Sequence, residues 1–230
     1  MGNQLNFGGF ADFDEWFYER DIHIIKEKAN EWKKCTTEES RRAHVSQNIV
    51  RWSEIYRLPY FNSVRFCVVD PMHCLFLGVA KWIVMKLWIG EGILNDKTLQ
   101  IMQKWADKIK FPSDLGRHPV RIATGEGFSN YMADMWKTFI LIFATPILWD
   151  ILQETDKKIL TYFVRACLIL TSRRLQKNEL NEAFKRLLDM NKLIEQKYGQ
   201  EKISPNLHLC LHICECALDY IWPFIFILML

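Results

Sequence analysis

Four ionisable side chains near the C-terminus fall on one face of a predicted helix. His208, His212, Glu215 and Asp219 are four, three and four residues apart, a spacing that places them along one stripe. Two histidines four residues apart can direct both imidazoles at one zinc ion, so His208 and His212 are candidate metal ligands. The alternative is a polar stripe that packs against another helix through hydrogen bonds. Spacing alone favours this structural interpretation.

Asp70 and His73 form a second candidate site, at the start of another predicted helix. Residues three apart in a first turn lie on one side of the helix, so these two could share a metal ion or pair as carboxylate and imidazole. They are the candidate catalytic residues of the chain. However, Asp followed by Pro71 is also typical of a helix N-cap with proline in the first turn. The sequence favours the capping role.

A third candidate is a basic surface between residues 172 and 202. This stretch holds eight Lys and Arg against five Asp and Glu. Arg173, Arg174, Lys185 and Arg186 are therefore candidate contacts for the phosphates of a nucleic acid. The alternative is an ordinary solvated helix face, which the same composition would also give.

The composition bounds the structures that can position these residues. Of 230 residues, 50% are hydrophobic and 25% are charged, with a net charge of +3, which is typical of a globular protein and excludes a disordered tail or a multi-span membrane protein. Gly and Pro number only 10 and 7, which disfavours a sandwich or barrel of many short strands. The seven Cys follow no disulfide pattern and no apolar leader opens the chain, so we expect a reducing compartment and no secretion.

Apolar residues at helical spacing predict a mainly α fold, a bundle-like array of about seven or eight helices with at most one or two short strands. We expect one capping box from Thr36 to Glu39, further caps at Asn95, Asn178 and Ser204, and one strand over 64–69. The predicted helices lie within 13–32, 36–56, 71–90, 95–109, 129–141, 155–175, 178–198 and 204–219.

Several blocks of the sequence resemble the CACTA-type (En/Spm) DNA transposases. The most distinctive, Val68–Gly78, is similar to the family's VVDPMHNLFLG. The blocks follow the family's order and span residues 14–220. The others are Arg51–Phe61, Asp134–Ile142, Phe163–Cys167 and Ile203–Tyr220.

The resemblance implies a DDE transposase, an RNase H-like enzyme in which three acidic residues hold two Mg²⁺ ions that activate water and then a DNA 3′-hydroxyl. In this family a large helical insertion precedes the final Glu, and the chain resembles that insertion. The resemblance divides it into an N-terminal helical segment (1–62), an insertion-like domain (63–220) and a divergent apolar tail (221–230). The tail is too short to span a membrane, so we expect no membrane association.

The chain departs from the family pattern at the residues on which catalysis and zinc binding depend, and these departures decide which function we expect. The family's three catalytic acids have no counterpart in the chain, and the Cys pair that shares zinc with the residues matching His208 and His212 is also missing. Cys210 stands where the family usually has a middle His. We therefore expect a truncated transposase-derived protein without strand-transfer activity of its own, with zinc as a possible cofactor and Mg²⁺ only in the parent family.

The resemblance also implies partners and location. DNA at transposon ends and a full-length transposase are the expected partners, in the nucleus. Two alternatives stay open: a non-enzymatic helical interaction module that pairs with full-length transposase, and a DNA-binding remnant.

Overall fold

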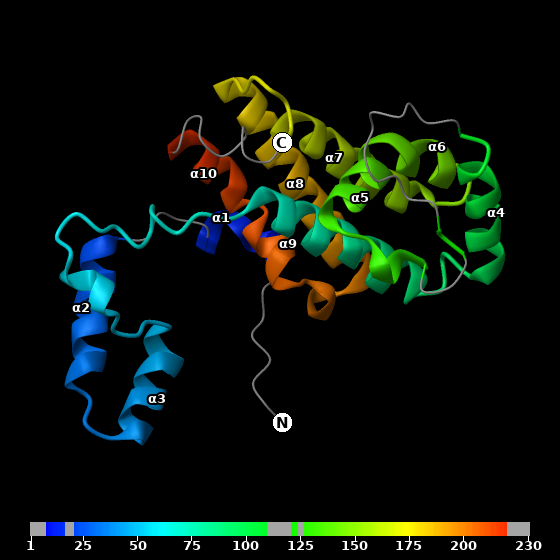
Figure 1. Ribbon diagram of the computed structural model, residues 1–230. Helices are drawn as coiled ribbons and strands as arrows, with labels where there is room; N and C mark the ends of the chain where they lie inside the picture. The colour runs from blue at the N-terminus through cyan, green and yellow to red at the C-terminus, as the bar shows by residue number, and fades with distance from the viewer. Residues whose placement is uncertain (1–7, 17–20, 110–120, 124–126, 220–230) are drawn as a thin grey trace. The chain divides into compact units, whose positions relative to one another are not determined.

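The structure is a computed structural model that describes residues 8–16, 21–109, 121–123 and 127–219. Within these ranges every regular element is helical, with ten α-helices and no strand, which confirms the mainly α prediction (Figure 1). The chain divides into a small unit, residues 12–68, and a large unit, residues 1–11 with 69–230. The predicted apolar tail lies outside the described residues.

The small unit is built around two helices that pack against each other, α2 (Ile22–Lys34) and α3 (Glu38–Asn48). The short helices η1 (Phe10–Asp12) and α1 (Phe13–Trp16) come before them, and η2 (Glu54–Arg57) follows. Asp21 caps α2 by accepting a bond from the His23 backbone. The predicted helix over 13–32 is thus at least two helices, since a new one begins at Ile22.

The capping box of α3 is displaced by one residue from its predicted place. The Thr37 hydroxyl accepts a bond from the Ser40 backbone (3.1 Å), and the Ser40 hydroxyl accepts one from the Thr37 backbone (3.3 Å). A serine hydroxyl thus takes the role that was predicted for the Glu39 side chain. The helix also ends earlier than predicted, at Ile49, which adopts a left-handed φ of 57° that strains a β-branched residue.

The predicted strand over 64–69 does not form. The Asn62 side chain accepts bonds from the backbone N–H groups of Val64 (3.0 Å) and Arg65 (3.2 Å), and the Phe66 N–H bonds to the Asn62 carbonyl (2.7 Å). These local bonds hold the backbone in turns and compete with the pairing that a strand needs.

The first helix of the large unit runs from Met72 to Ile89 and is wound more widely than an α-helix. It comprises two π-helical stretches, η3 (Met72–Ala80) and η4 (Ile83–Ile89), joined by Lys81 and Trp82. It is the one described helix long and apolar enough to cross a membrane, with mean hydropathy 1.5, but 56% of it is buried inside the protein. A buried core helix has the same composition, so its position in the fold accounts for its apolar character.

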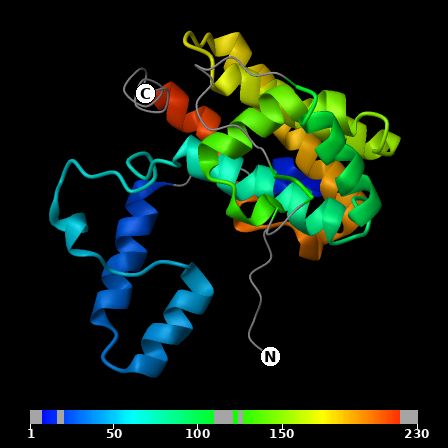
Figure 2. The ribbon, with the colours of Figure 1, turned by 45° about the vertical axis from the view of Figure 1, so that its right-hand side comes forward.

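The remaining helices pack around this one. The most extensive contact joins α7 (Glu154–Leu170) and α8 (Lys177–Tyr198), which lie side by side in both views (Figures 1 and 2). The others in chain order are α4 (Asp96–Ala106), η5 (Gly127–Asn130), α5 (Ala133–Thr138), η6 (Phe139–Phe143), α6 (Ala144–Leu148), η7 (Gln200–Lys202), α9 (Pro205–Leu209) and α10 (His212–Asp219).

Three further boundaries differ from the predictions. Helix α7 ends at Leu170 rather than near residue 175, and α8 begins after Gln176, which forms a capping box with Glu179, rather than after Asn178. The predicted single helix over 204–219 is broken, because a turn at Cys210 and Leu211 separates α9 from α10. The caps predicted at Asn95 and Ser204 are confirmed.

Candidate functional sites

Asp70 caps the first helix of the large unit. Its Oδ1 accepts bonds from the backbone N–H groups of Met72 (2.9 Å) and His73 (3.4 Å), and its Oδ2 contacts His73 Nδ1. Burial alone would raise the pKa of Asp70, but the bonds from the His73 ring and from the two amides outweigh it, so the pKa lies below its usual value. The carboxylate is therefore ionised, and both its oxygens are engaged locally.

The two candidate zinc ligands remain neighbours although the helix between them is broken. The ring centroids of His208 and His212 lie 5.4 Å apart, and His212 Nδ1 lies 2.8 Å from Glu215 Oε2. Among the described residues, no three His, Cys, Asp or Glu side chains gather in a way that could hold a metal ion. Zinc binding by this pair therefore stays a prediction that requires ligands from elsewhere.

Several cysteines lie close to the same region and are buried. Cys74 donates to the Asn206 carbonyl (3.5 Å), and Cys210 donates to the Leu207 carbonyl (3.0 Å). Burial raises the pKa of Cys74 and of Cys214 to about 12, and also raises the pKa of Cys210. In this structure the thiols are therefore protonated and pack in the interior of the large unit.

The four predicted phosphate contacts differ in exposure and in the contacts that their side chains make. Arg173 and Arg174 lie in the turn between α7 and α8, and both are exposed, as is Lys185 on α8. Arg186 instead lies over the Tyr162 ring (5.2 Å to the centroid) and near Glu182 (3.8 Å). Arg173, Arg174 and Lys185 are therefore accessible to an anion. The Arg186 guanidinium already contacts Tyr162 and lies near Glu182.

A cluster around buried Asp156 was missed by the sequence reasoning. Asp156 is fully buried at the start of α7 and accepts bonds from Trp88 Nε1 (3.1 Å) on η4 and from the Tyr198 hydroxyl (2.5 Å) on α8. Its other oxygen pairs with Lys197 Nζ. The spacing of Asp156 from Ile159 puts it on the apolar face of α7, and this pattern could have identified it. The cluster joins three helices and is structural.

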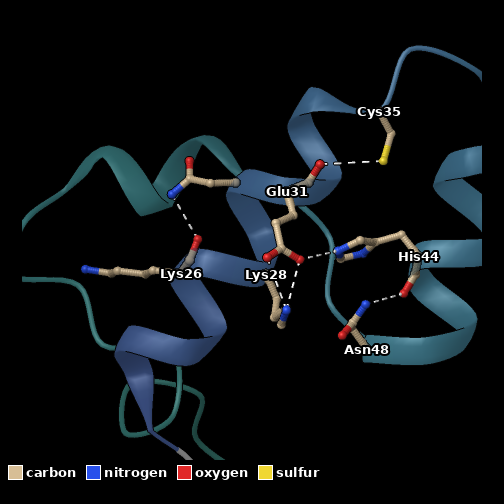
Figure 3. A network of polar contacts seen from close by, with 7 residues as sticks. Lys26, Lys28, Glu31, Cys35, His44 and Asn48 are labelled. Atoms are coloured by element: carbon tan, nitrogen blue, oxygen red, sulfur yellow. Dashed lines mark hydrogen bonds and ion pairs between the residues drawn. The ribbon is translucent and has the colours of Figure 1, made fainter.

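A second missed cluster joins α2 and α3 in the small unit (Figure 3). Glu31 accepts two bonds from Lys28 Nζ (3.1 and 3.0 Å) and lies 3.4 Å from His44 Nε2. The bond from Lys28 holds the pKa of Glu31 below its usual value, against burial, with a further contribution from His44. Asn48 donates to the His44 carbonyl (3.2 Å), so the His44 position is held from both sides. The network fixes how the two helices pair.

Two blocks of the transposase resemblance meet in the large unit. Gly78, in the Val68–Gly78 block, faces Asn206, in the Ile203–Tyr220 block. A Cβ added at Gly78 would lie 2.5 Å from Asn206 Cγ, closer than real side chains approach. The Cys74 bond to the Asn206 carbonyl belongs to the same contact. Blocks separated by more than a hundred residues thus form one packed junction between η3 and α9.

Comparison with known protein families, with curated proteins and with solved structures finds no match to the chain.

Proposed function

We propose that the chain derives from a CACTA-type cut-and-paste transposase and corresponds to the family's helical insertion. In this role it contacts DNA without cutting it. The observation that carries the proposal is the packed junction of Gly78 and Asn206, because the most distinctive block of the resemblance and the block at its C-terminal end supply the two sides of one contact. A chance likeness of short motifs gives no reason for them to meet in space.

Asp70 carries no catalytic role in this proposal. A metal-binding carboxylate in a DDE site needs an oxygen free to meet Mg²⁺. The Asp70 oxygens are instead engaged by two backbone amides and by the His73 ring. In this proposal the 230-residue chain binds DNA but has no strand-transfer activity, because the two metal ions are held by the catalytic part of the parent enzyme.

DNA is contacted through the turn between α7 and α8. Arg173 and Arg174 are exposed in this turn and Lys185 is exposed on α8, and exposed cations attract phosphates at long range. The two arginines are adjacent in sequence, so they can contact neighbouring phosphates of one strand. In the cell this activity requires nuclear localisation and, through the parent family, a full-length transposase as a partner.

A nicking assay tests the absence of catalysis. The purified chain is incubated with supercoiled plasmid and Mg²⁺, beside a D70N variant that keeps the shape of the capping group. We expect no nicked product from either protein. Mg²⁺-dependent nicking by the parent chain that D70N abolishes would overturn the proposal, because Asp70 would then be a metal ligand.

A binding assay tests the DNA contact. The apparent affinity for a labelled duplex should fall steeply with salt, and the R173Q/R174Q double variant should weaken binding at low salt by about tenfold or more. The K97Q/K104Q double variant removes two exposed positive charges from α4 and is the matched control. Tight binding to full-length transposase with indifference to DNA would instead support the non-enzymatic interaction module.

A further inference from the structure

A series of aromatic rings organises residues 49–66 of the small unit, which we call the aromatic-basic segment. The centroids of Trp52 and Tyr56 lie 6.0 Å apart, those of Tyr56 and Phe61 lie 6.3 Å apart, and those of Phe61 and Phe66 lie 5.6 Å apart. All three contacts are tilted or edge-on, the arrangement that aromatic quadrupoles favour. Ring contacts therefore order a segment whose only regular element is the one turn of η2.

Two rings at the end of this segment are left open to solvent. Tyr60 is 70% exposed, and Phe66 is 47% exposed although its ring contacts Phe61. No hydrogen bond or ring contact joins Tyr60 to another described residue. Both rings belong to one short segment, and large apolar side chains exposed on a folded protein are candidates for binding.

The chain on either side of these rings is rich in positive charge. Residues 33–68 contain seven Lys and Arg against three Asp and Glu. Lys33 Nζ lies 4.0 Å from the centre of the Trp52 ring, and Arg51 is exposed. Arg57 pairs with Glu54 (2.6 Å), but each of these side chains is 67% exposed. An exposed pair of this kind stabilises the protein only weakly, so a phosphate can replace the Glu54 carboxylate.

We propose that the aromatic-basic segment binds single-stranded nucleic acid. Tyr60 and Phe66 supply faces on which unpaired bases stack, and Lys33, Arg51 and Arg57 supply cations for the phosphates. The combination favours a single strand over a duplex, because the bases of a duplex are already stacked on one another. It also favours a nucleic acid over an acidic peptide, which would use the cations but not the ring faces.

This inference deepens the proposed function, and it rests on that function in one respect, that the partner is a nucleic acid. It places a second contact in the small unit, separate in residues from the cations of the turn between α7 and α8. A strand opened at a transposon end is one source of such a ligand and an RNA is another. Both present unpaired bases on a phosphate backbone, and the test separates them.

The test measures fluorescence anisotropy with the whole 230-residue chain and three labelled probes: an oligothymidylate of about 15 nucleotides, the matching oligouridylate, and a duplex of equal length. We expect Y60A to weaken oligothymidylate binding by about tenfold. Y60F should bind as the parent does, because it keeps the ring. Far-UV circular dichroism establishes that each variant retains its helices.

The matched control is W105A on α4. Trp105 is also exposed (54%) and also lies beside a lysine, with Lys108 Nζ 5.6 Å from the ring centre. This variant removes a comparable ring from a different place and should bind the oligonucleotides unchanged. Oligothymidylate and oligouridylate differ in the thymine methyl group as well as in the sugar, so unlabelled oligodeoxyuridylate, which differs from oligouridylate only in the sugar, is used as a competitor. Unequal competition by the two uridylates identifies DNA or RNA as the source of the strand, and equal competition means that the 2′-hydroxyl does not matter.

The outcomes separate the two proposals. If Y60A binds the oligothymidylate as tightly as W105A does, or if an acidic polyglutamate competes as well as the oligonucleotide, the single-strand site is refuted. Duplex binding that is lost in R173Q/R174Q would survive that result and keep the proposed function. Failure to bind any of the three probes at low salt would refute both.

Discussion

At the scale of single residues, Gly78 is required by its neighbour rather than by its backbone angles. A Cβ at this position would lie 2.5 Å from Asn206 Cγ and 2.7 Å from Asn206 Cβ. Even the smallest side chain must therefore push η3 and α9 apart, unless Asn206 gives way. The requirement is set by a residue distant in sequence.

We predict that G78A lowers the free energy of unfolding by about 1–3 kcal/mol, the usual cost of overpacking. N206A removes the two closest atoms, so the double variant G78A/N206A should be more stable than the sum of the single effects implies. Urea denaturation of the four proteins measures this coupling. Strictly additive effects would contradict the contact.

Asp70 yields a second prediction at this scale, in two parts. D70A should lower the free energy of unfolding at neutral pH by about 1 kcal/mol, since it removes the cap of the first core helix. The native state lowers the pKa of Asp70, so this stabilisation is present above the pKa of the unfolded chain, about 3.9, and is lost as the pH falls through the lower native pKa.

Urea denaturation of the parent and D70A at pH 7 and at pH 2.5 measures both parts. The two proteins should differ at pH 7, and the difference should be smaller at pH 2.5, because the protonated carboxyl group keeps an acceptor oxygen but loses its charge. D70N is the control, because its amide oxygen can still accept the bonds from the Met72 and His73 amides. A difference between parent and D70A that is the same at both pH values would show that the charge of Asp70 is not what stabilises the helix.

At the scale of elements, the existence of the helices could be predicted from the sequence and many of their ends could not. The periodicity of α4, α7 and α8 gave helices in the right places, because each has one apolar face. The ends depend on which hydroxyl or amide reaches a backbone N–H, as with Ser40 in place of Glu39. Residues 64–69 have the composition of a strand, but a strand also needs a partner, which local sequence cannot supply.

How far each candidate site could be predicted also depends on whether its residues are neighbours in the sequence. The capping role of Asp70 follows from two adjacent residues and could be read directly. The Asp156 cluster depends on residues from three helices that meet only in the folded chain. The sequence near Asp156 does not indicate that Trp88 and Tyr198 are its hydrogen-bond partners.

The Asp156 cluster yields the third prediction. D156A should lower the free energy of unfolding by about 3 kcal/mol, because it leaves the buried polar groups of Trp88 and Tyr198 without an acceptor. D156N keeps one acceptor oxygen and should cost less. Chemical denaturation measures both.

Glu154 on the same helix provides the control. It is exposed and pairs with Lys157 at 2.8 Å, so E154A should change stability far less than D156A does. Equal effects of D156A and E154A would mean that the buried cluster contributes no more than a surface ion pair.

At the scale of the whole molecule, the seven cysteines report on the integrity of the fold. Cys67 is exposed and Cys35 is half-buried, and neither is in a disulfide. Cys74, Cys167, Cys210 and Cys214 are buried, and burial raises the pKa of each. The buried four come from three helices of the large unit and from the turn between α9 and α10.

We predict that a thiol-alkylating reagent modifies Cys67 and Cys35 first. The buried four should react only as the large unit unfolds, since each thiol must become both accessible and ionised. Mass spectrometry of peptides after timed labelling at pH 8 measures the order. Modification of Cys74 as fast as Cys67 would show that the first core helix is not packed as described.

The wide winding of the helix from Met72 to Ile89 bears on how the chain tolerates changes of length. A π-helical turn bonds each residue to the fifth one before it and so accommodates one residue more than an α turn. If a residue were deleted near Lys81, the adjoining turns could rewind to α spacing, and the residues after the deletion would keep their facing. The same deletion in α7 would rotate every later side chain by about 100° and move the apolar face away from α8. Insertions and deletions between relatives should therefore be tolerated in the first core helix and excluded from α7.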